Sequence, residues 1–190
     1  FTILSLANNH TPNFGETGLL DTFNELTKAE LLYVGAGKNE DEAYAPVIIE
    51  KNGLKFAFLA ENDSDVVPSL YKAGVNHAGT AIMDINTLSN GVSEAKKQAD
   101  FVIVSMHSGT EYASKPNSRQ TAFAHTAIDA GADLVIGHHP HVIQGVEHYK
   151  GKYIFYSLGN FVFDQLFSTQ TREGLIAKIV FSKSGIEKIE

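Results

Sequence analysis

Apolar runs alternate with amphipathic stretches along the first two thirds of the chain. Short apolar runs typical of buried β-strands occupy residues 1–7, 31–37, 100–107 and 133–139. Apolar residues spaced three to four apart predict helices over residues 16–29, 86–99 and 117–130. Strands and helices that follow one another in this way are typical of an α/β protein.

The remaining apolar segments predict β-hairpins. Residues 46–61 hold two apolar runs around Asn52-Gly53, a dipeptide that favours a type I′ turn. Two more hairpins are predicted near the end of the chain, over residues 145–163 and 174–190. Residues 62–81 lack such a pattern and are predicted as a loop. We therefore expect a mixed sheet, or two sheets packed face to face under outer helices, in one domain over residues 1–190.

The first residue, Phe1, lies inside an apolar run that reads as a core strand. A natural protein rarely begins in this way, without a methionine or a polar lead, and no signal peptide is visible. We therefore expect residues 1–190 to be the C-terminal portion of a longer domain whose N-terminal part is missing.

The composition excludes several kinds of function and says less about the fold. The net charge is −7, and an acidic surface is poorly suited to nucleic acid, so we expect no nucleic-acid partner. The chain has no cysteine, which excludes disulfides, thiolate zinc sites and cysteine nucleophiles.

Three histidines stand within four positions where the strand predicted over residues 133–139 ends: His138, His139 and His141. His139 and His141 are two residues apart, and in an extended segment this spacing puts both rings on one side. His138 would then point away or support the other two. Crowded imidazoles at a strand end favour a metal site, whereas the alternative is that these histidines are structural.

Other strands end in groups of the same kind. Asn9 and His10 follow the first strand, His107 ends another with Glu111 close behind, and Asn160 follows a later one. The carboxyl ends of parallel strands meet at one edge of a sheet, so we expect these groups to converge. Imidazole and amide or carboxylate oxygen bind divalent Mn, Zn or Fe, and a pocket of this kind could hold one or two ions. Paired ions activate water and bind the oxygens of a phosphoryl group.

Four longer motifs occur in a fixed order along the chain: LANNHTPNFGETGLLDT, VIVSMHSGTEY, GADLVIGHHPHVIQGVE and YSLGNFVFD. Together they resemble the motifs of the bacterial capsule synthesis family, the CapA/PgsA group of poly-γ-glutamate synthesis. The resemblance covers residues 1 to about 180. It implies the fold of the calcineurin-like metallophosphoesterases, a four-layer α/β/β/α sandwich with a metal site at the strand ends.

The resemblance also implies roles for individual residues. The implied ligands of a divalent metal are Asn9, His107, His139 and His141. His10 matches a catalytic acid or phosphate-binding group. Three further candidates for the site are His138, Glu111 and Asn160. The aspartates of an earlier strand and the Gly-Asp motif that complete such sites are not present, because the chain starts at the strand that ends in Asn8-Asn9-His10.

Two functions fit these observations. One is a metal-dependent hydrolase of the phosphoesterase type, associated with capsule or poly-γ-glutamate synthesis, acting on capsule polymer or on a small phosphoester. The other is a non-catalytic component of a poly-γ-glutamate synthesis or export machine that binds polymer or partner. In either case the resemblance implies membrane-bound synthase partners. It also implies a location on the extracellular face of the bacterial membrane, through an upstream anchor.

Overall fold

The central element of the fold is a six-stranded mixed sheet. The structure is a computed structural model that describes residues 1–190. In spatial order the strands are β4 (Val47–Lys51), β5 (Leu54–Asn62), β7 (Phe101–His107), β8 (Leu134–His138), β10 (Lys152–Phe155) and β9 (Val146–Tyr149). The four inner strands run parallel, and β4 and β9 pair antiparallel with their neighbours at the two edges.

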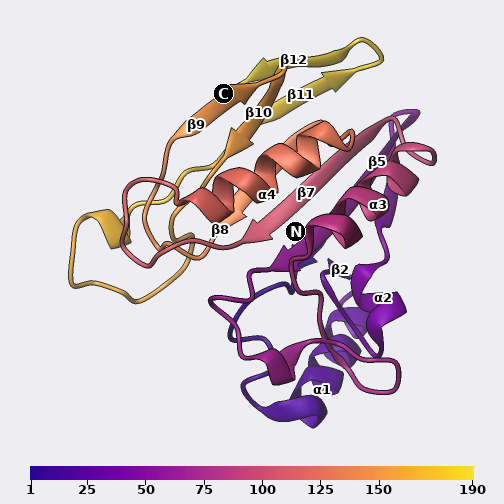
Figure 1. Ribbon diagram of the computed structural model, residues 1–190, viewed down its shortest axis with the longest axis vertical. Helices are drawn as coiled ribbons and strands as arrows, with labels where there is room; N and C mark the ends of the chain where they lie inside the picture. The colour runs from indigo at the N-terminus through magenta and orange to yellow at the C-terminus, as the bar shows by residue number, and fades with distance from the viewer.

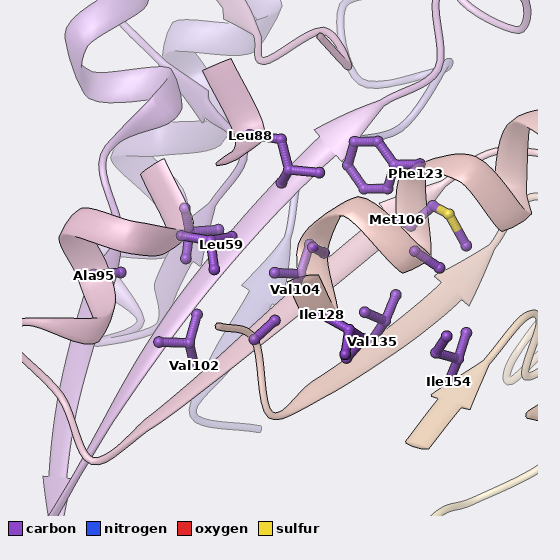
Figure 2. Close-up of a cluster of buried hydrophobic side chains, with 14 of the residues drawn as sticks. Leu59, Leu88, Ala95, Val102, Val104, Met106, Phe123, Ile128, Val135 and Ile154 are labelled. Atoms are coloured by element: carbon purple, nitrogen blue, oxygen red, sulfur yellow. The ribbon is translucent and has the colours of Figure 1, made fainter. Parts of the chain in front are cut away.

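Two helices, α3 (Ile85–Lys96) and α4 (Ser118–Asp129), cover one face of this sheet (Figure 1). Their apolar sides meet the alternate residues of the inner strands in the main core. Figure 2 shows this core, which includes Leu59, Leu88, Val102, Val104, Met106, Phe123, Val135 and Ile154. Both helices begin at side-chain caps: Asp84 accepts from two backbone amides, and Asn117 forms a capping box with Gln120.

Short strands form a second β layer on the opposite face. Strand β1 (Ile3–Ser5) pairs parallel with β2 (Leu32–Val34), and β11 (Ile179–Ser182) forms a hairpin with β12 (Gly185–Ile189). Val34 packs towards Ala60 of β5, while Tyr33 stacks on Phe23 of α1 (Gly15–Lys28). Along this line the order of layers is α3, β5, β2 and α1, which is an α/β/β/α arrangement.

Several short elements lie between the larger ones. They are β3 (Ala36–Gly37), α2 (Glu40–Tyr44), β6 (Gly79–Thr80) and two single 3₁₀ turns, Ser69–Tyr71 and Gln170–Arg172. β3 lies inside the strand predicted over residues 31–37. The sequence pattern did not predict the other short elements, because pieces of two to five residues carry no hydrophobic period of their own.

The predicted α/β class is confirmed, and each predicted long helix is present within three residues of its expected ends. The turn of the first hairpin also agrees with its sequence signal. Asn52 and Gly53 have φ of 54° and 74°, as a type I′ turn requires. The hairpin predicted over residues 145–163 ends earlier than expected, since β10 stops at Phe155 and an irregular segment follows.

Leu88 offers a direct test of the main core. It is fully buried between α3 and the sheet, so Leu88→Ala should lower the free energy of unfolding by about 2–5 kcal/mol in urea denaturation. Leu70→Ala is the matched control, because that side chain is 75% exposed and should change stability by less than about 0.5 kcal/mol. Equal effects of the two substitutions would contradict this account of the core.

Candidate functional site

One cavity lies at the carboxyl ends of the inner strands and beside the loop that follows β1. Its volume is about 420 Å³. The lining residues come from four separate segments: Ser5, Ala7, Asn8, Asn9 and His10; His107; His138, His139 and His141; and Gly159, Asn160, Phe161, Val162 and Phe163. Seven of the eight predicted site residues therefore line one cavity. The eighth, Glu111, is exposed on the loop after β7 and does not line it.

His107 and Asn9 form the first polar pair of this cavity. His107 is the last residue of β7 and is buried, and Asn9 follows β1 in a turn. The imidazole Nε2 lies 2.9 Å from the amide Oδ1 of Asn9, although the two residues are 98 positions apart. Two adjacent ligands of an octahedral metal, each about 2.1 Å from the ion, are separated by about 3 Å. The contact is a hydrogen bond that Nε2 donates to Oδ1, and its length is also compatible with the spacing of two neighbouring metal ligands.

The histidine-rich loop departs from the extended conformation expected for it. His139 has φ of 101° and His141 has φ of 60°, both in the left-handed region that side chains larger than glycine rarely adopt. The predicted extended conformation of this segment is therefore wrong, and alternation along a strand does not determine where the two rings point. The two rings still share the cavity, with centroids 6.1 Å apart. His138, expected to point away or to support the other two, also lines it.

Asn160 fixes the orientation of His141. Its amide nitrogen donates to the carbonyl of Thr171 at 2.9 Å, so its Oδ1 is the atom that accepts from His141 Nδ1 at 2.8 Å. The His141 ring then carries its proton on Nδ1 and leaves Nε2 with a free lone pair. A partner of this kind is the usual way to orient a metal-binding imidazole.

Burial keeps three histidines of the cavity neutral: His107, His138 and His139. Desolvation, with smaller contributions from the neighbouring histidines, lowers the pKa of His107 to about 2. Burial also lowers the pKa of His138 and of His139. Neutral imidazole is the form that binds a metal, so protons do not compete for these rings near pH 7. In addition, the Nδ1 of His139 is buried and has no hydrogen-bond partner.

An ion pair between the buried carboxylate of Asp63 and the half-exposed guanidinium of Arg119 supports the strand ends that carry the cavity. The backbone amide of Asp63 donates to the carbonyl of His107, and the hydroxyl of Ser108 donates to Asp63 Oδ2 at 2.6 Å. Arg119 of α4 donates to Asp63 Oδ1 through Nε at 3.0 Å. Burial alone would raise the pKa of Asp63, but the hydrogen bonds from Arg119 and Ser108 outweigh it and lower that pKa. This network joins the ends of β5 and β7 to α4.

The fourth wall of the cavity is apolar. Phe161, Val162 and Phe163 line it, although their side chains remain half or more exposed. Phe163 also lies against the ring of His141, with centroids 5.3 Å apart. A ligand in this cavity would therefore meet imidazoles and amides on one side and exposed apolar surface on the other.

The donor atoms of the cavity are of the types that bind a divalent metal, but only some of them lie close enough together to bind the same ion. Imidazole nitrogen and amide oxygen suit such an ion, and the Asn9–His107 pair has the required spacing. However, no three His, Asp or Glu side chains of the structure lie close enough together to hold a metal ion. The described residues thus bring imidazole and amide groups to one cavity, without a carboxylate.

Sequence reasoning missed several residues of this site. Asn62 is the last residue of β5 and Asp63 follows it, both in a segment predicted as loop, and Ser108 and Arg119 support Asp63. A signal was present, because three polar residues, Glu61, Asn62 and Asp63, stand where β5 ends, as polar residues do at the ends of the neighbouring strands. The apolar wall of Phe161–Phe163 carried no such signal, since the pattern there continued that of a strand.

Similarity to solved structures supports the fold. A Staphylococcus aureus protein assigned as a 5'-nucleotidase, solved with alpha-ketoglutarate, matches the whole chain and 37% of its own length, with a TM-score of 0.64 and 16% identity. The Thermus thermophilus sulfate thiohydrolase SoxB, solved with glycerol, matches 90% of the chain and 29% of its own length, with a TM-score of 0.54 and 15% identity. The fold is therefore of the metallophosphoesterase type.

Sequence comparison identifies the family. Residues 1–165 match the bacterial capsule synthesis protein family, PGA_cap, and the chain belongs to this family. It is 42% identical to the PGA biosynthesis protein CapA of Bacillus subtilis (strain 168), over the whole chain and 50% of that protein. It is 41% identical to the capsule biosynthesis protein CapA of Bacillus anthracis, over 97% of the chain and 45% of that protein. The chain thus spans about half the length of the curated relatives it matches.

None of the helices in the structure has both the length and the apolar character that crossing a membrane requires.

The Asp63 network predicts a specific dependence of stability on pH. A carboxyl whose pKa is lowered by folding stabilises the protein above its unfolded pKa, near 4, and this contribution is lost as pH falls through the folded value. Asp63→Asn should therefore lower the free energy of unfolding at pH 7 by about 2 kcal/mol and weaken its decline below pH 4. Urea titrations from pH 2 to 7 measure both effects.

Asp129→Asn provides the control for this experiment. Asp129 also forms an ion pair, with Lys150, but both side chains are largely exposed to water. This substitution should change stability little at any pH. If Asp63→Asn behaved like Asp129→Asn, the buried network would not hold the strand ends together as described.

Proposed function

We propose that this chain carries the imidazole and amide part of a divalent-metal site, in a phosphoester hydrolase that serves capsule or poly-γ-glutamate synthesis. One observation carries the proposal: side chains from three segments far apart in sequence, including Asn9, His107 and His139, line one cavity at a sheet edge. The metallophosphoesterase-type fold and the membership in the capsule synthesis family support it. The substrate class would be capsule polymer or a small phosphoester.

In this proposal the metal, Mn, Zn or Fe, is held by one amide oxygen and three imidazoles, from Asn9, His107, His139 and His141. When bound, a divalent ion lowers the pKa of water and polarises a phosphoryl oxygen. Burial keeps the rings of His107 and His139 neutral, and Asn160 holds the proton of His141 on Nδ1, which leaves the lone pair of that ring on Nε2. The buried Nδ1 of His139 has no partner, which a bound ion or its ligands would provide.

His10 is the candidate proton donor of the reaction. It is exposed at the rim of the cavity, and the side-chain nitrogen of Asn13 lies 3.1 Å from its Nδ1. Because the amide nitrogen of Asn13 donates, Nδ1 accepts, and the ring proton is on Nε2. That N–H can hydrogen-bond to the leaving-group oxygen of a phosphoester bound in the cavity, and transfer of a proton to that oxygen requires a second proton on the ring, so that neutral imidazole is left behind.

A second function has an observation in its favour. No three His, Asp or Glu side chains converge on one point, as a complete catalytic metal site would require. The chain would then be a non-catalytic component of a poly-γ-glutamate synthesis or export machine, and the cavity would bind polymer or a partner. The net charge of −7 opposes direct binding of a polyanion, so this alternative also calls for a bridging cation.

The membership in the capsule synthesis family also bears on the location and the partners of the protein. We propose that the protein acts at the extracellular face of the bacterial membrane, beside membrane-bound synthase partners. The capsule biosynthesis named for its Bacillus anthracis relative supports this placement.

The metal site can be tested through its ligands. His107→Ala and His139→Ala should each weaken Mn²⁺ binding by at least about 100-fold in calorimetric titration, because each removes a ligand. Hydrolysis of bis-p-nitrophenyl phosphate should be lost with it. His148→Ala is the matched control, since that histidine is exposed on β9 away from the cavity, and should behave as the wild type.

The outcomes separate the two functions. Mn²⁺ binding and hydrolysis that survive in both His107→Ala and His139→Ala would refute the proposed site. Binding that depends on these histidines, without hydrolysis in any variant, would favour the non-catalytic function.

His10 provides an independent test, because it donates a proton without holding the metal. His10→Ala should leave Mn²⁺ affinity within about twofold of wild type while lowering kcat about 10²- to 10⁴-fold. The loss should be smaller for a substrate whose leaving group needs no proton, such as p-nitrophenolate. Equal losses for activated and unactivated phosphoesters would exclude His10 as the acid.

A further inference from the structure

The side chain of Asn62, the last residue of β5, is buried without a hydrogen bond. It is fully excluded from solvent, and neither Oδ1 nor Nδ2 of its side chain has a hydrogen-bond partner. Its backbone is fully paired, because its amide donates to Ala81 and its carbonyl accepts from Met83. An unpaired buried polar group costs about 1–3 kcal/mol, whereas an apolar side chain of the same shape would cost nothing. The carboxamide is therefore unfavourable for stability alone.

The direction of the side chain follows from alternation along β5. Asn62 lies on the same face as Ala60, which packs against Ala7, a residue that lines the cavity. Glu61 lies on the opposite face, which the helices cover. Leu59, two residues earlier and therefore on the same face as Glu61, belongs to the main core under those helices. Asn62 therefore points to the side of the sheet on which the cavity lies.

The register of the sheet places Asn62 in a row with two histidines. Asn62 pairs with His107 of β7, and His107 pairs with His138 of β8. In parallel neighbouring strands, paired residues lie on the same face and the strands are about 4.8 Å apart. Asn62, His107 and His138 thus form one row across three strands, and two of the three line the cavity.

From this placement, we infer that Asn62 is a further residue of the site, whose carboxamide hydrogen-bonds a ligand of the metal ion held at His107. The inference rests on the metal site proposed above. An amide offers one acceptor and two donors, so it can orient either an imidazole or a water molecule bound to the ion. Asn62 is then a positioning residue, and the cost of its unpaired carboxamide is recovered when the site is filled.

Asn62→Leu tests this role, because leucine has a similar volume and no polar atom. Mn²⁺ alone is the probe, titrated into the metal-free protein by calorimetry at pH 7. The substitution should weaken Mn²⁺ binding by about 10- to 100-fold, which is the usual effect of removing a partner of a metal ligand. At the same time, the melting temperature of the metal-free protein should stay the same or rise.

Two companion variants make the result decisive. Glu61→Gln is the matched control, since Glu61 is equally buried at the same strand end and also has an unpaired oxygen, but faces the helices. It should leave Mn²⁺ affinity unchanged. Asn62→Asp keeps the size and an acceptor oxygen and should restore binding to within about threefold of wild type, which covers the case in which Asn62→Leu does not fold.

The results distinguish this inference from the proposed function. Wild-type affinity in Asn62→Leu would overturn the role of Asn62 and leave the metal site intact, as would a lowered melting temperature with unchanged affinity. If Asn62→Leu does not fold, affinity in Asn62→Asp more than threefold below that of wild type overturns the role. A wild-type protein that binds no Mn²⁺ would overturn both proposals together.

Discussion

The parallel pairing of β5, β7 and β8 is the constraint on which the candidate site depends. Its register aligns Asn62, His107 and His138 across three strands, so that their side chains leave the sheet at one edge and on one face. The same face carries the apolar residues that hold β1 in place, such as Ala60 against Ala7. As a result, Asn9, which follows β1, reaches His107 across 98 positions of sequence. A shift of one residue in β7 would turn His107 towards the helices and remove the site.

The backbone conformation and the unpaired polar groups of the site lower the stability of the fold, and contacts around the site offset this cost. Positive φ at His139 and His141 costs about 1–3 kcal/mol each, and the unpaired groups of His139 and Asn62 add to this. The pair of the buried Asp63 with Arg119 holds the ends of β5 and β7 in place, and the hydrogen bond from His141 to Asn160 holds the histidine-rich loop. A glycine also takes part: a side chain at Gly137 would collide with the backbone of Tyr156, so β8 can approach β10 closely only without one.

The long elements were predictable because each buries an apolar stripe that leaves a period in the sequence. Helices α1, α3 and α4 and the hairpin at Asn52-Gly53 belong to this group. The grouping of His107 with the later histidines was also predictable, since parallel strand ends meet at one edge. The conformation at His139 was not, because local alternation says nothing of a loop that is held by distant partners: the backbone amide of Tyr112 donates to the carbonyl of Pro140, and Asn160 bonds the ring of His141. Nor was Asn62, whose position depends on the register with β7 rather than on its neighbours in sequence.

The charge of the donor set bears on the substrate as well as on the metal. The cavity is lined by imidazoles and amides and has no carboxylate among its residues, and burial keeps at least three of the imidazoles neutral. A divalent ion held by neutral ligands keeps its full charge, which strengthens its attraction for an anion inside a poorly solvated cavity. A phosphoryl group would provide that compensating charge, whereas a neutral substrate would not. In the proposed metal site, the neutral groups that this chain contributes would leave more of the ion's charge for an anionic substrate, in a chain whose overall charge would otherwise repel it.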